Sequence, residues 1–295
     1  MHLLLLTARP ETRTNHRLAE TAVDLGLDLA LIDATTVPAI AGAGGASRLV
    51  ADDVLEHPPD GVLARVGNWR PASVLAVLEA CVDSGAATPN SPSAIRIGRD
   101  HWQTIRLLAA ADLPVPSTLA GADPETLAEA AVRDLGLPVV VKQRQSRMGV
   151  GVILCTARDH LEAVLDSLWR VGDEVVVQRW LPGGRNSHRL LVVGAEVVAA
   201  ARFSAGAGEW RSNAARGGSA EKITPDSDEK RLAVSAARIL GLGHCGIDMV
   251  AGEHGPVILE VNPTPGFLCL EEATGVDVAR ALVEHLVACV NGPPE

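Results

Sequence analysis

The spacing of short apolar runs changes along this chain of 295 residues, and that change constrains the fold more than any other feature. In the first 90 residues, strand-like runs alternate with helical segments, in the order 3–7, 15–25, 29–32, 61–64 and 73–81. Such alternation is typical of a parallel α/β lobe. We therefore expect residues 1–90 to form one compact unit of this kind.

The middle of the chain, residues 91–175, is predicted to form a second lobe. Apolar residues recur at helical spacing from Trp102 to Ala109, which predicts an amphipathic helix. Further on, the apolar strand 138–142 (PVVVK) leads into a loop that contains glycine, 143–151. This lobe is therefore expected to combine helices with strands.

Residues 176–295 are predicted to form a third lobe with antiparallel strands. One hairpin is expected around the two-residue turn candidate Gly194-Ala195, and a second is closed by GEHG at 252–255. Hairpins pair neighbouring strands antiparallel, unlike the alternating pattern of the first lobe. The fold class expected for the whole chain is α/β, with α+β character in the last lobe.

Composition argues against several classes of protein. The formal net charge of −10 disfavours a nucleic-acid backbone as the main partner. No apolar run approaches the roughly 18 residues that a membrane span needs, and the opening MHLLLLTARP fits a buried strand better than a signal peptide. The five cysteines contain no C-x-x-C pair, so neither a disulfide framework nor a zinc site is expected. These features favour a cytoplasmic protein without a membrane partner.

Three oxygen-bearing residues of the second hairpin, Asp248, Glu260 and Asn262, form the strongest candidate site. If GEHG closes the hairpin with three central residues, Asp248 lies opposite Glu260, and strand periodicity puts Asn262 on the same face as Glu260. Two carboxylates and an amide oxygen, together with substrate phosphates, suit Mg²⁺. The alternative is a set of polar residues on a sheet face that is exposed to solvent.

Lysine is rare in this sequence, which has 23 arginines but only three lysines. One of the three, Lys142, ends an apolar strand and faces a loop that contains Gly149 and Gly151. A lysine buried without a partner is costly, so Lys142 is expected to reach an anion such as a nucleotide phosphate. The glycines would let backbone N–H groups approach the phosphate oxygens. The alternative is a lysine that extends into solvent at a strand end.

The loop 209–220 (EWRSNAARGGSA) gathers Arg211, Asn213 and Arg216 with two glycines. Guanidinium groups match the geometry of phosphates and carboxylates. Taken alone, the loop is better explained as a solvated basic segment. Together with a metal hairpin and a phosphate-binding lysine, it favours a site for phosphoryl transfer, where developing charge needs Mg²⁺ and fixed cations.

In this order, the residues resemble the ATP-grasp superfamily and, within it, the RimK-type α-L-glutamate ligases. The resemblance runs over nearly the whole chain and is densest in the segments 90–100, 139–152, 190–200, 210–218, 245–250, 258–267 and 271–279. It implies the ATP-grasp fold, in which the N-terminal α/β lobe is followed by two lobes that clamp ATP between two sheets. The implied cofactors are ATP and Mg²⁺, with Mn²⁺ as an alternative metal.

The resemblance also implies roles for individual side chains. Lys142 would bind the phosphates, while Arg179 and Trp180 would lie at the adenine hinge. Arg211 and Asn213 would contact the reacting phosphoryl group as catalytic residues. Two Mg²⁺ ions would be held by Asp248, Glu260 and Asn262. The full implied nucleotide-binding set is His101, Lys142, Gln178, Arg179, Trp180, Ser187, Arg211, Ser212 and Asn213.

Four positions depart from the family pattern. His101 stands where the family usually has a second nucleotide-binding lysine, and Arg179 where it has a glutamate before an aromatic residue. Ser187 stands where an acidic residue usually meets the ribose. The segment 201–204 (ARFS) carries one arginine where the family has both arginine and lysine. The first three departures bear on nucleotide affinity, and the last bears on the amino-acid substrate.

The expected activity is that of an ATP-grasp carboxylate–amine ligase. ATP phosphorylates a carboxylate, and an amine then attacks the acyl-phosphate, so that no side-chain nucleophile is needed. The resemblance implies glutamate or a similar amino acid as the amine, and a peptide, carrier protein or small acid as the acceptor. A homo-oligomer is also expected. Two alternatives stay open: another ATP-grasp ligase, of the carrier-protein, glutathione-synthetase-like or natural-product type, and a nucleotide-binding protein of this fold without turnover.

Overall fold

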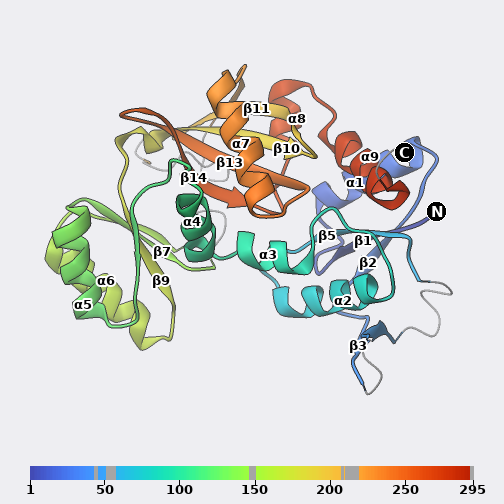
Figure 1. Cartoon of the computed structure of the whole chain (residues 1–295), viewed down its shortest axis with the longest axis horizontal. Coiled ribbons are helices and arrows are strands. Elements are labelled where there is room, and N and C mark those ends of the chain that lie inside the picture. The colour runs from blue at the N-terminus through green and yellow to red at the C-terminus, as the bar shows by residue number, and fades with distance from the viewer. Residues whose placement is uncertain (43–45, 51–57, 146–150, 207–208, 210–218, 293–295) are drawn as a thin grey trace.

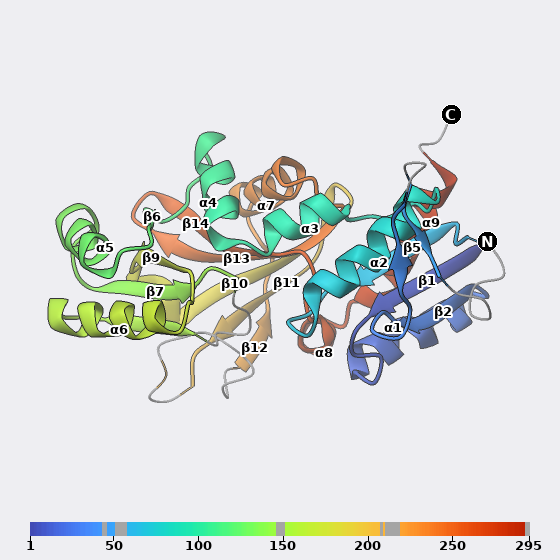
Figure 2. The ribbon, with the colours of Figure 1, turned by 90° about the horizontal axis from the view of Figure 1, so that it is seen from below.

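The computed structural model describes residues 1–42, 46–50, 58–145, 151–206, 209 and 219–292. Its three main sheets follow one another along the long axis of the molecule, with a five-stranded sheet in the middle (Figure 1). The view turned by 90° shows the same order (Figure 2). Among the described residues, no helix is both long enough and apolar enough to cross a membrane.

The sheet nearest the N-terminus is parallel and has the strand order β2-β1-β5. It is built with its helices from β1 (His2–Thr7), α1 (Arg13–Asp24), β2 (Asp28–Asp33), β5 (Gly61–Arg65) and α2 (Pro71–Asp83). Alternate leucines of β1 point to opposite faces: Leu3 and Leu5 join one apolar cluster, whereas Leu4 and Leu6 join another. Both faces are therefore covered, as expected for a parallel sheet. A short antiparallel pair, β3 (Ala39–Ile40) and β4 (Arg48–Leu49), lies beside α2.

The sheet at the other end of the molecule is antiparallel, with the order β6-β9-β7-β8. Two helices, α3 (Pro92–Gly98) and α4 (His101–Ala110), lead into it. The sheet and its helices comprise β6 (Thr118–Ala120), α5 (Pro124–Ala130), a π-helical turn (Ala131–Leu135), β7 (Val139–Gln143), β8 (Val152–Cys155), α6 (Arg158–Arg170) and β9 (Val175–Arg179). Val139 and Val141 pack in the same cluster as the helices α5 and α6. Lys142, next along β7, therefore points to the opposite face.

The central sheet is antiparallel, with the order β12-β11-β10-β13-β14. Its elements are a 3₁₀ turn (Pro182–Arg185), β10 (Asn186–Val193), β11 (Glu196–Ser204), β12 (Ser219–Lys222), α7 (Ser227–Ile239), β13 (His244–Gly252) and β14 (Gly255–Asn262). Val193 pairs with Glu196, so the predicted two-residue turn is confirmed, and Gly194 takes the positive φ of 61° that such a turn needs. Helix α7 starts with a capping box between Asp226 and Glu229.

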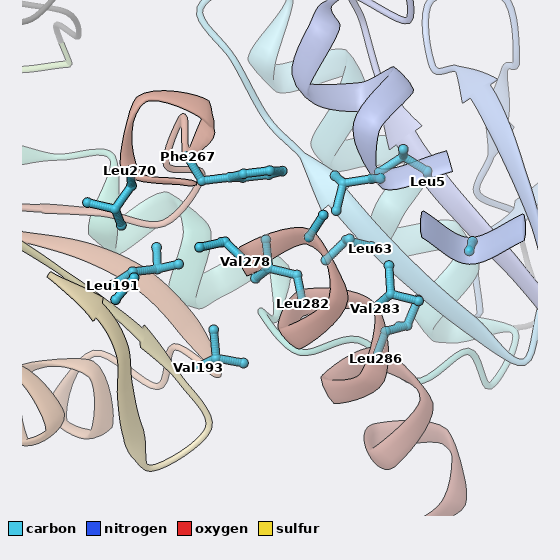
Figure 3. Close-up of a cluster of buried hydrophobic side chains, with 14 of the residues drawn as sticks. Leu5, Leu63, Leu191, Val193, Phe267, Leu270, Val278, Leu282, Val283 and Leu286 are labelled. Atoms are coloured by element: carbon cyan, nitrogen blue, oxygen red, sulfur yellow. The ribbon is translucent and has the colours of Figure 1, made fainter. Parts of the chain in front are cut away.

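The end of the chain ties the central sheet to the first one through α8 (Leu268–Thr274) and α9 (Val278–Asn291). Figure 3 shows side chains of β10, α8 and α9 in one apolar cluster with Leu5 and Leu63 of the N-terminal sheet. The lobe boundaries at 90/91 and 175/176 stay predictions. Two facts bear on them: β9 starts at Val175 and belongs to the four-stranded sheet, and α9 packs against α1 and β5.

Candidate active site

The hairpin of β13 and β14 carries the candidate metal ligands Asp248, Glu260 and Asn262. Asp248 pairs with Glu260 across the hairpin, so the predicted pairing of the two carboxylates is confirmed. Asn262 lies two residues beyond Glu260, and strand periodicity puts it on the same face. The role of these residues as Mg²⁺ ligands stays a prediction.

The turn of this hairpin is tighter than expected. Gly252 pairs with Gly255, which leaves two central residues instead of the three that were expected. A register shift beside Asp248 then adds one extra residue to β14, as in a β-bulge. The bulge restores the pairing that a three-residue turn would have produced. The expected pair is therefore right, although the expected turn is wrong.

Asp248 is held by an arginine that the sequence did not single out. Arg189 on β10 lies opposite Asp248 in the sheet register. Its Nε and Nη2 each donate to a different carboxylate oxygen of Asp248, both at 2.6 Å. Such bidentate, charge-assisted contacts are among the strong hydrogen bonds of proteins. Because each carboxylate oxygen keeps a further lone pair, Asp248 can still bind a metal ion while Arg189 holds it.

Burial and charge act in opposite directions on Arg189. Its guanidinium lies 5.0 Å from the centre of the Phe203 ring, and burial by itself lowers its pKa. The charge and hydrogen bonds of Asp248, with a further contribution from Glu260, outweigh burial and raise the pKa of Arg189 above its ordinary value. Arg189 is therefore a permanent cation within the candidate site.

Lys142 reaches the same carboxylates from the facing sheet. Burial lowers its pKa, while the charges of Glu260 and Asp248 oppose that shift, which places the ammonium group near both carboxylates. Its Nζ donates to Oε1 of Gln178 at 2.7 Å, and Nε2 of Gln178 donates to Oγ1 of Thr118 at 3.1 Å. Gln178, which is only 3% exposed, thus orients the lysine. Two cations and two carboxylates meet between two sheets.

The chain is similar to known proteins in sequence and in structure. The RimK-like ATP-grasp domain model matches residues 98–286. A protein of Marinomonas sp. strain MWYL1, named as a probable alpha-L-glutamate ligase, is 31% identical over 97% of this chain and 95% of its own length.

Among solved structures, the ATP-grasp ligase PsnB in complex with a minimal precursor has a TM-score of 0.76 and 23% identity, covering 98% of this chain and 99% of its own. A RimK domain ATP-grasp protein from Sphaerobacter thermophilus has a TM-score of 0.75 and 24% identity, covering 98% and 100%.

The chain belongs to the RimK-like ATP-grasp family. The family model covers more than half of the sequence, and the curated relative spans nearly all of it. The two structural matches show the same fold over almost the full length. The family resemblance and the ATP-grasp fold inferred from the sequence are therefore confirmed, as is the class of ATP-grasp ligase. The residue roles that the resemblance implies have to be judged from the structure.

At the expected adenine hinge, Arg179 and Gln178 point to opposite faces of β9. The guanidinium of Arg179 is exposed and donates from Nη2 to the carbonyl oxygen of Asp134 at 3.5 Å, on the helical face of the sheet. Its backbone N–H donates to Ser117, and that of Trp180 donates to Pro138. An adenine contact from Arg179 would therefore come from its main chain, and the hinge role of both residues stays a prediction.

Ser187 and His101, two departures from the ATP-grasp pattern, have different surroundings. Ser187 is 5% exposed and lies two residues before Arg189, on the same face of β10. His101 begins α4, but Asp100 is the residue that caps this helix. The backbone N–H of His101 donates to the carbonyl oxygen of Arg144, two residues beyond Lys142, at 2.9 Å. His101 thus lies beside the strand end of Lys142, and its contact with phosphate stays a prediction.

Arg211, Ser212 and Asn213 lie outside the described residues, as does Gly149. Their expected contacts with the nucleotide stay predictions. Within the described ranges, no three His, Cys, Asp or Glu side chains come together as a metal site. The candidate ligand set is therefore two carboxylates and one amide oxygen, which fits a hard cation such as Mg²⁺ that keeps several waters and binds substrate phosphates.

Arg189 could have been found from the sequence. It stands in the apolar run HRLLVV, where a charged residue inside a strand needs a partner, just as Lys142 does in PVVVK. The same signal marks Arg65 at the end of GVLAR. Because the sequence has only three lysines, Lys142 was conspicuous. Among 23 arginines, Arg189 and Arg65 were not.

Proposed function

We propose that this chain is an ATP- and Mg²⁺-dependent carboxylate–amine ligase that adds glutamate or a similar amino acid to a peptide, protein or small acid. The observation that carries the proposal is the meeting of Lys142 with Asp248, Glu260 and Arg189 between two sheets. Relatives named as probable alpha-L-glutamate ligases support the amino acid, and the PsnB complexes with Mg, ADP and precursor support the nucleotide, metal and peptide acceptor.

The reaction has two steps. A carboxylate oxygen of the acceptor forms a bond to the γ-phosphorus of ATP, and the bond from that phosphorus to the bridging oxygen breaks, releasing ADP. The amine then attacks the acyl carbon, loses a proton and expels inorganic phosphate, which leaves an amide. The protein contributes position and charge neutralisation to both steps.

Each charged side chain has a role in this proposal. Lys142 and Arg189 neutralise phosphate charge from opposite sheets, and Gln178 and Asp248 hold them in place. Asp248, Glu260 and Asn262 would hold Mg²⁺, which supplies further neutralisation of the transferring group when bound. Arg211 and Asn213 would contact that group from the loop 209–220. Mn²⁺ is proposed to substitute for Mg²⁺.

A peptide acceptor is favoured by a second observation. PsnB and a RiPP-associated ATP-grasp ligase of Chryseobacterium gregarium, both of this fold, were solved with peptides. We infer a peptide or protein carboxylate as the acceptor, with a small acid or a carrier protein as the alternative. The homo-oligomeric state and the cytoplasmic location stay predictions.

The test is release of ADP with panels of acids and amines, followed by mass spectrometry of the product. A ligase sustains ADP release over many turnovers only when both substrates are present, and the product mass equals the two substrates minus one water. Nucleotide binding without ADP release across the whole panel would contradict the proposal and favour a binding protein of this fold. ADP release without an amide product would identify a kinase-like activity instead.

A further inference from the structure

Enclosed polar atoms without a partner gather at one junction of the molecule. Within the described part of the chain, the enclosed side-chain atoms that lack a hydrogen-bond partner are Nε and Nη1 of Arg65, Nδ1 of His244 and Oγ1 of Thr264. Asn90 joins two of these segments, since its Nδ2 donates to the carbonyl oxygens of His244 at 2.9 Å and Pro263 at 3.0 Å. We call Arg65, His244 and Thr264 the Arg65 junction.

Arg65 is the charged member of this junction. It is only 8% exposed, and its guanidinium lies 5.7 Å from the centre of the Phe267 ring. Burial lowers its pKa to about 10, so it stays protonated at neutral pH, and among the described residues no carboxylate opposes that shift. An enclosed cation without a counter-ion is costly to keep, and a ligand anion would remove much of that cost.

The place of Arg65 in the fold suits a ligand. It ends β5 at the carboxyl edge of the parallel N-terminal sheet, the edge where open α/β sheets bind their ligands. It also lies close to the phosphoryl-transfer centre. Phe267 lies under Arg65, and Cys269, two residues further on, is near enough to Arg189 to act on its pKa. Two residues span at most about 7 Å of chain.

His244 contributes a neutral imidazole with an unpartnered nitrogen to the Arg65 junction. Burial, together with the charge of Arg65, lowers the pKa of His244 to about 3, with a smaller contribution from His285. The imidazole is therefore neutral at physiological pH. Its unpartnered Nδ1 is a polar group near Arg65 that can add a contact to a bound carboxylate, and the unpartnered Thr264 hydroxyl follows Pro263, which Asn90 links to His244.

Building on the proposed ligase function, we infer that Arg65 binds the non-reacting carboxylate of the amino acid that supplies the amine. The reacting carboxylate has to lie where Lys142, Arg189 and the metal ligands converge. An amino acid held by its own carboxylate at Arg65 would direct its amine toward that centre and keep its carboxylate away from the transferred phosphoryl group. Arg65 is in this sense a residue that determines substrate specificity.

The test measures binding and does not require turnover. We would titrate L-glutamate into the full chain saturated with ADP and Mg²⁺, for wild type, Arg65→Met and Arg65→Lys. Removing one partner of an enclosed charge pair predicts at least about a 30-fold rise in the Kd of glutamate for Arg65→Met, with unchanged ADP affinity. Arg65→Lys keeps the charge but loses the planar fork, so an intermediate loss is expected.

Thermal unfolding separates a binding role from a structural one. Arg65→Met replaces an unpaired cation with an apolar chain of similar length, so its unfolding temperature should be unchanged or higher. The matched control is Arg99→Met, because Arg99 is also 8% exposed but its Nη1 donates to the carbonyl oxygen of Val66 at 2.8 Å. That variant should unfold at a lower temperature. Lower stability of Arg65→Met with wild-type glutamate affinity would overturn the inference.

Substrate analogues test the same point in the wild type, even if Arg65→Met does not fold. Glutamine and the α-amide of glutamate each remove one carboxylate charge, and the one that Arg65 binds should lose affinity about as strongly as Arg65→Met does. Equal affinity for glutamate and both amides, or no binding of glutamate to wild type, would overturn the inference. ADP release with some other amine would still support the ligase proposal, so the two failures are distinguishable.

Discussion

Two arginines of this molecule lie over phenylalanine rings, and their pKa values shift in opposite directions. Arg189 lies over Phe203 and is paired with Asp248, which raises its pKa. Arg65 lies over Phe267 and has no carboxylate partner in the part of the chain that the structure describes, so burial lowers its pKa. Arg65 is more deeply buried than Arg189, and the counter-charge of Asp248 decides the opposite direction of the shift at Arg189. The charge of Arg189 is therefore balanced by a carboxylate of the protein, whereas that of Arg65 is the one we propose to be balanced by a substrate carboxylate.

The largest loss of activity is expected from substitution of Asp248 and Glu260, the two carboxylates near Arg189. Glu260→Gln and Asp248→Asn should each reduce ADP formation at least about 100-fold, because each removes a charged metal ligand. Asp248→Asn should also lower the free energy of unfolding by about 1.5–3 kcal/mol, since Arg189 loses its counter-charge. Glu260→Gln leaves the hydrogen bonds between Arg189 and Asp248 in place. ADP release and denaturant unfolding measure the two quantities, and near-wild-type turnover of either variant would contradict the metal assignment.

His244 of the Arg65 junction should make the free energy of unfolding depend on pH. The folded-state pKa of His244 is about 3, far below its unfolded value near 6.5. Between these values the unfolded state binds a proton that the folded state does not, so stability rises with pH across this window and falls on acidification. The loss between about pH 6.5 and pH 4 should be on the order of a few kcal/mol. His244→Gln should flatten the curve, while the exposed control His160→Gln should not.

Substitution of Lys142 tests whether the four-stranded sheet contributes to nucleotide binding. Lys142→Met should raise the KM for ATP about 10- to 100-fold, because a charge-assisted contact with phosphate is lost. Lys222 and Lys230 are exposed, so Lys222→Met and Lys230→Met are matched controls that should leave the KM unchanged. Steady-state kinetics with varied ATP decide. Equal effects from all three substitutions would mean that Lys142 is a structural residue.

The sequence predicted the contacts of the candidate site between residues close in the chain, but not the contact between residues far apart in it. The two hairpins and the pairing of Asp248 with Glu260 follow from alternating strands and turn residues within a few positions. The contact of Arg189 with Asp248 joins residues 59 positions apart, and it depends on β10 lying next to β13. Neighbouring strands of a sheet are set by packing, which hydrophobic periodicity does not encode.

One further difference from the expected structure has a physical cause of the same kind. The bulge in β14 compensates for a turn one residue shorter than expected, and neither feature has a signature in GEHG itself. Arg179 and Gln178 were both assigned to nucleotide binding; strand alternation turns their side chains to opposite faces of β9, and both roles stay predictions. Arg65 is adjacent to the centre only because α8 and α9 bring the end of the chain back to the first sheet.

A smaller effect should distinguish the two arginines directly. Arg189→Met leaves Asp248 without its partner and should lower the free energy of unfolding by about 1.5–3 kcal/mol, because bonds to a charged group are lost. Arg65→Met should leave it unchanged or raise it. Denaturant unfolding of both variants gives the comparison. Equal destabilisation would mean that Arg65 has a structural partner and that the contrast between the two residues is wrong.

Metal binding tests the central claim most directly, namely that the hairpin carboxylates and Lys142 form one nucleotide–metal centre between two sheets. Mn²⁺ can be followed by electron paramagnetic resonance as it binds the full chain in the presence and absence of ADP. Wild type should bind Mn²⁺ more tightly with ADP, Glu260→Gln should lose that binding, and Lys142→Met should lose the enhancement by ADP. Unchanged Mn²⁺ affinity in Glu260→Gln with ADP present would contradict the account.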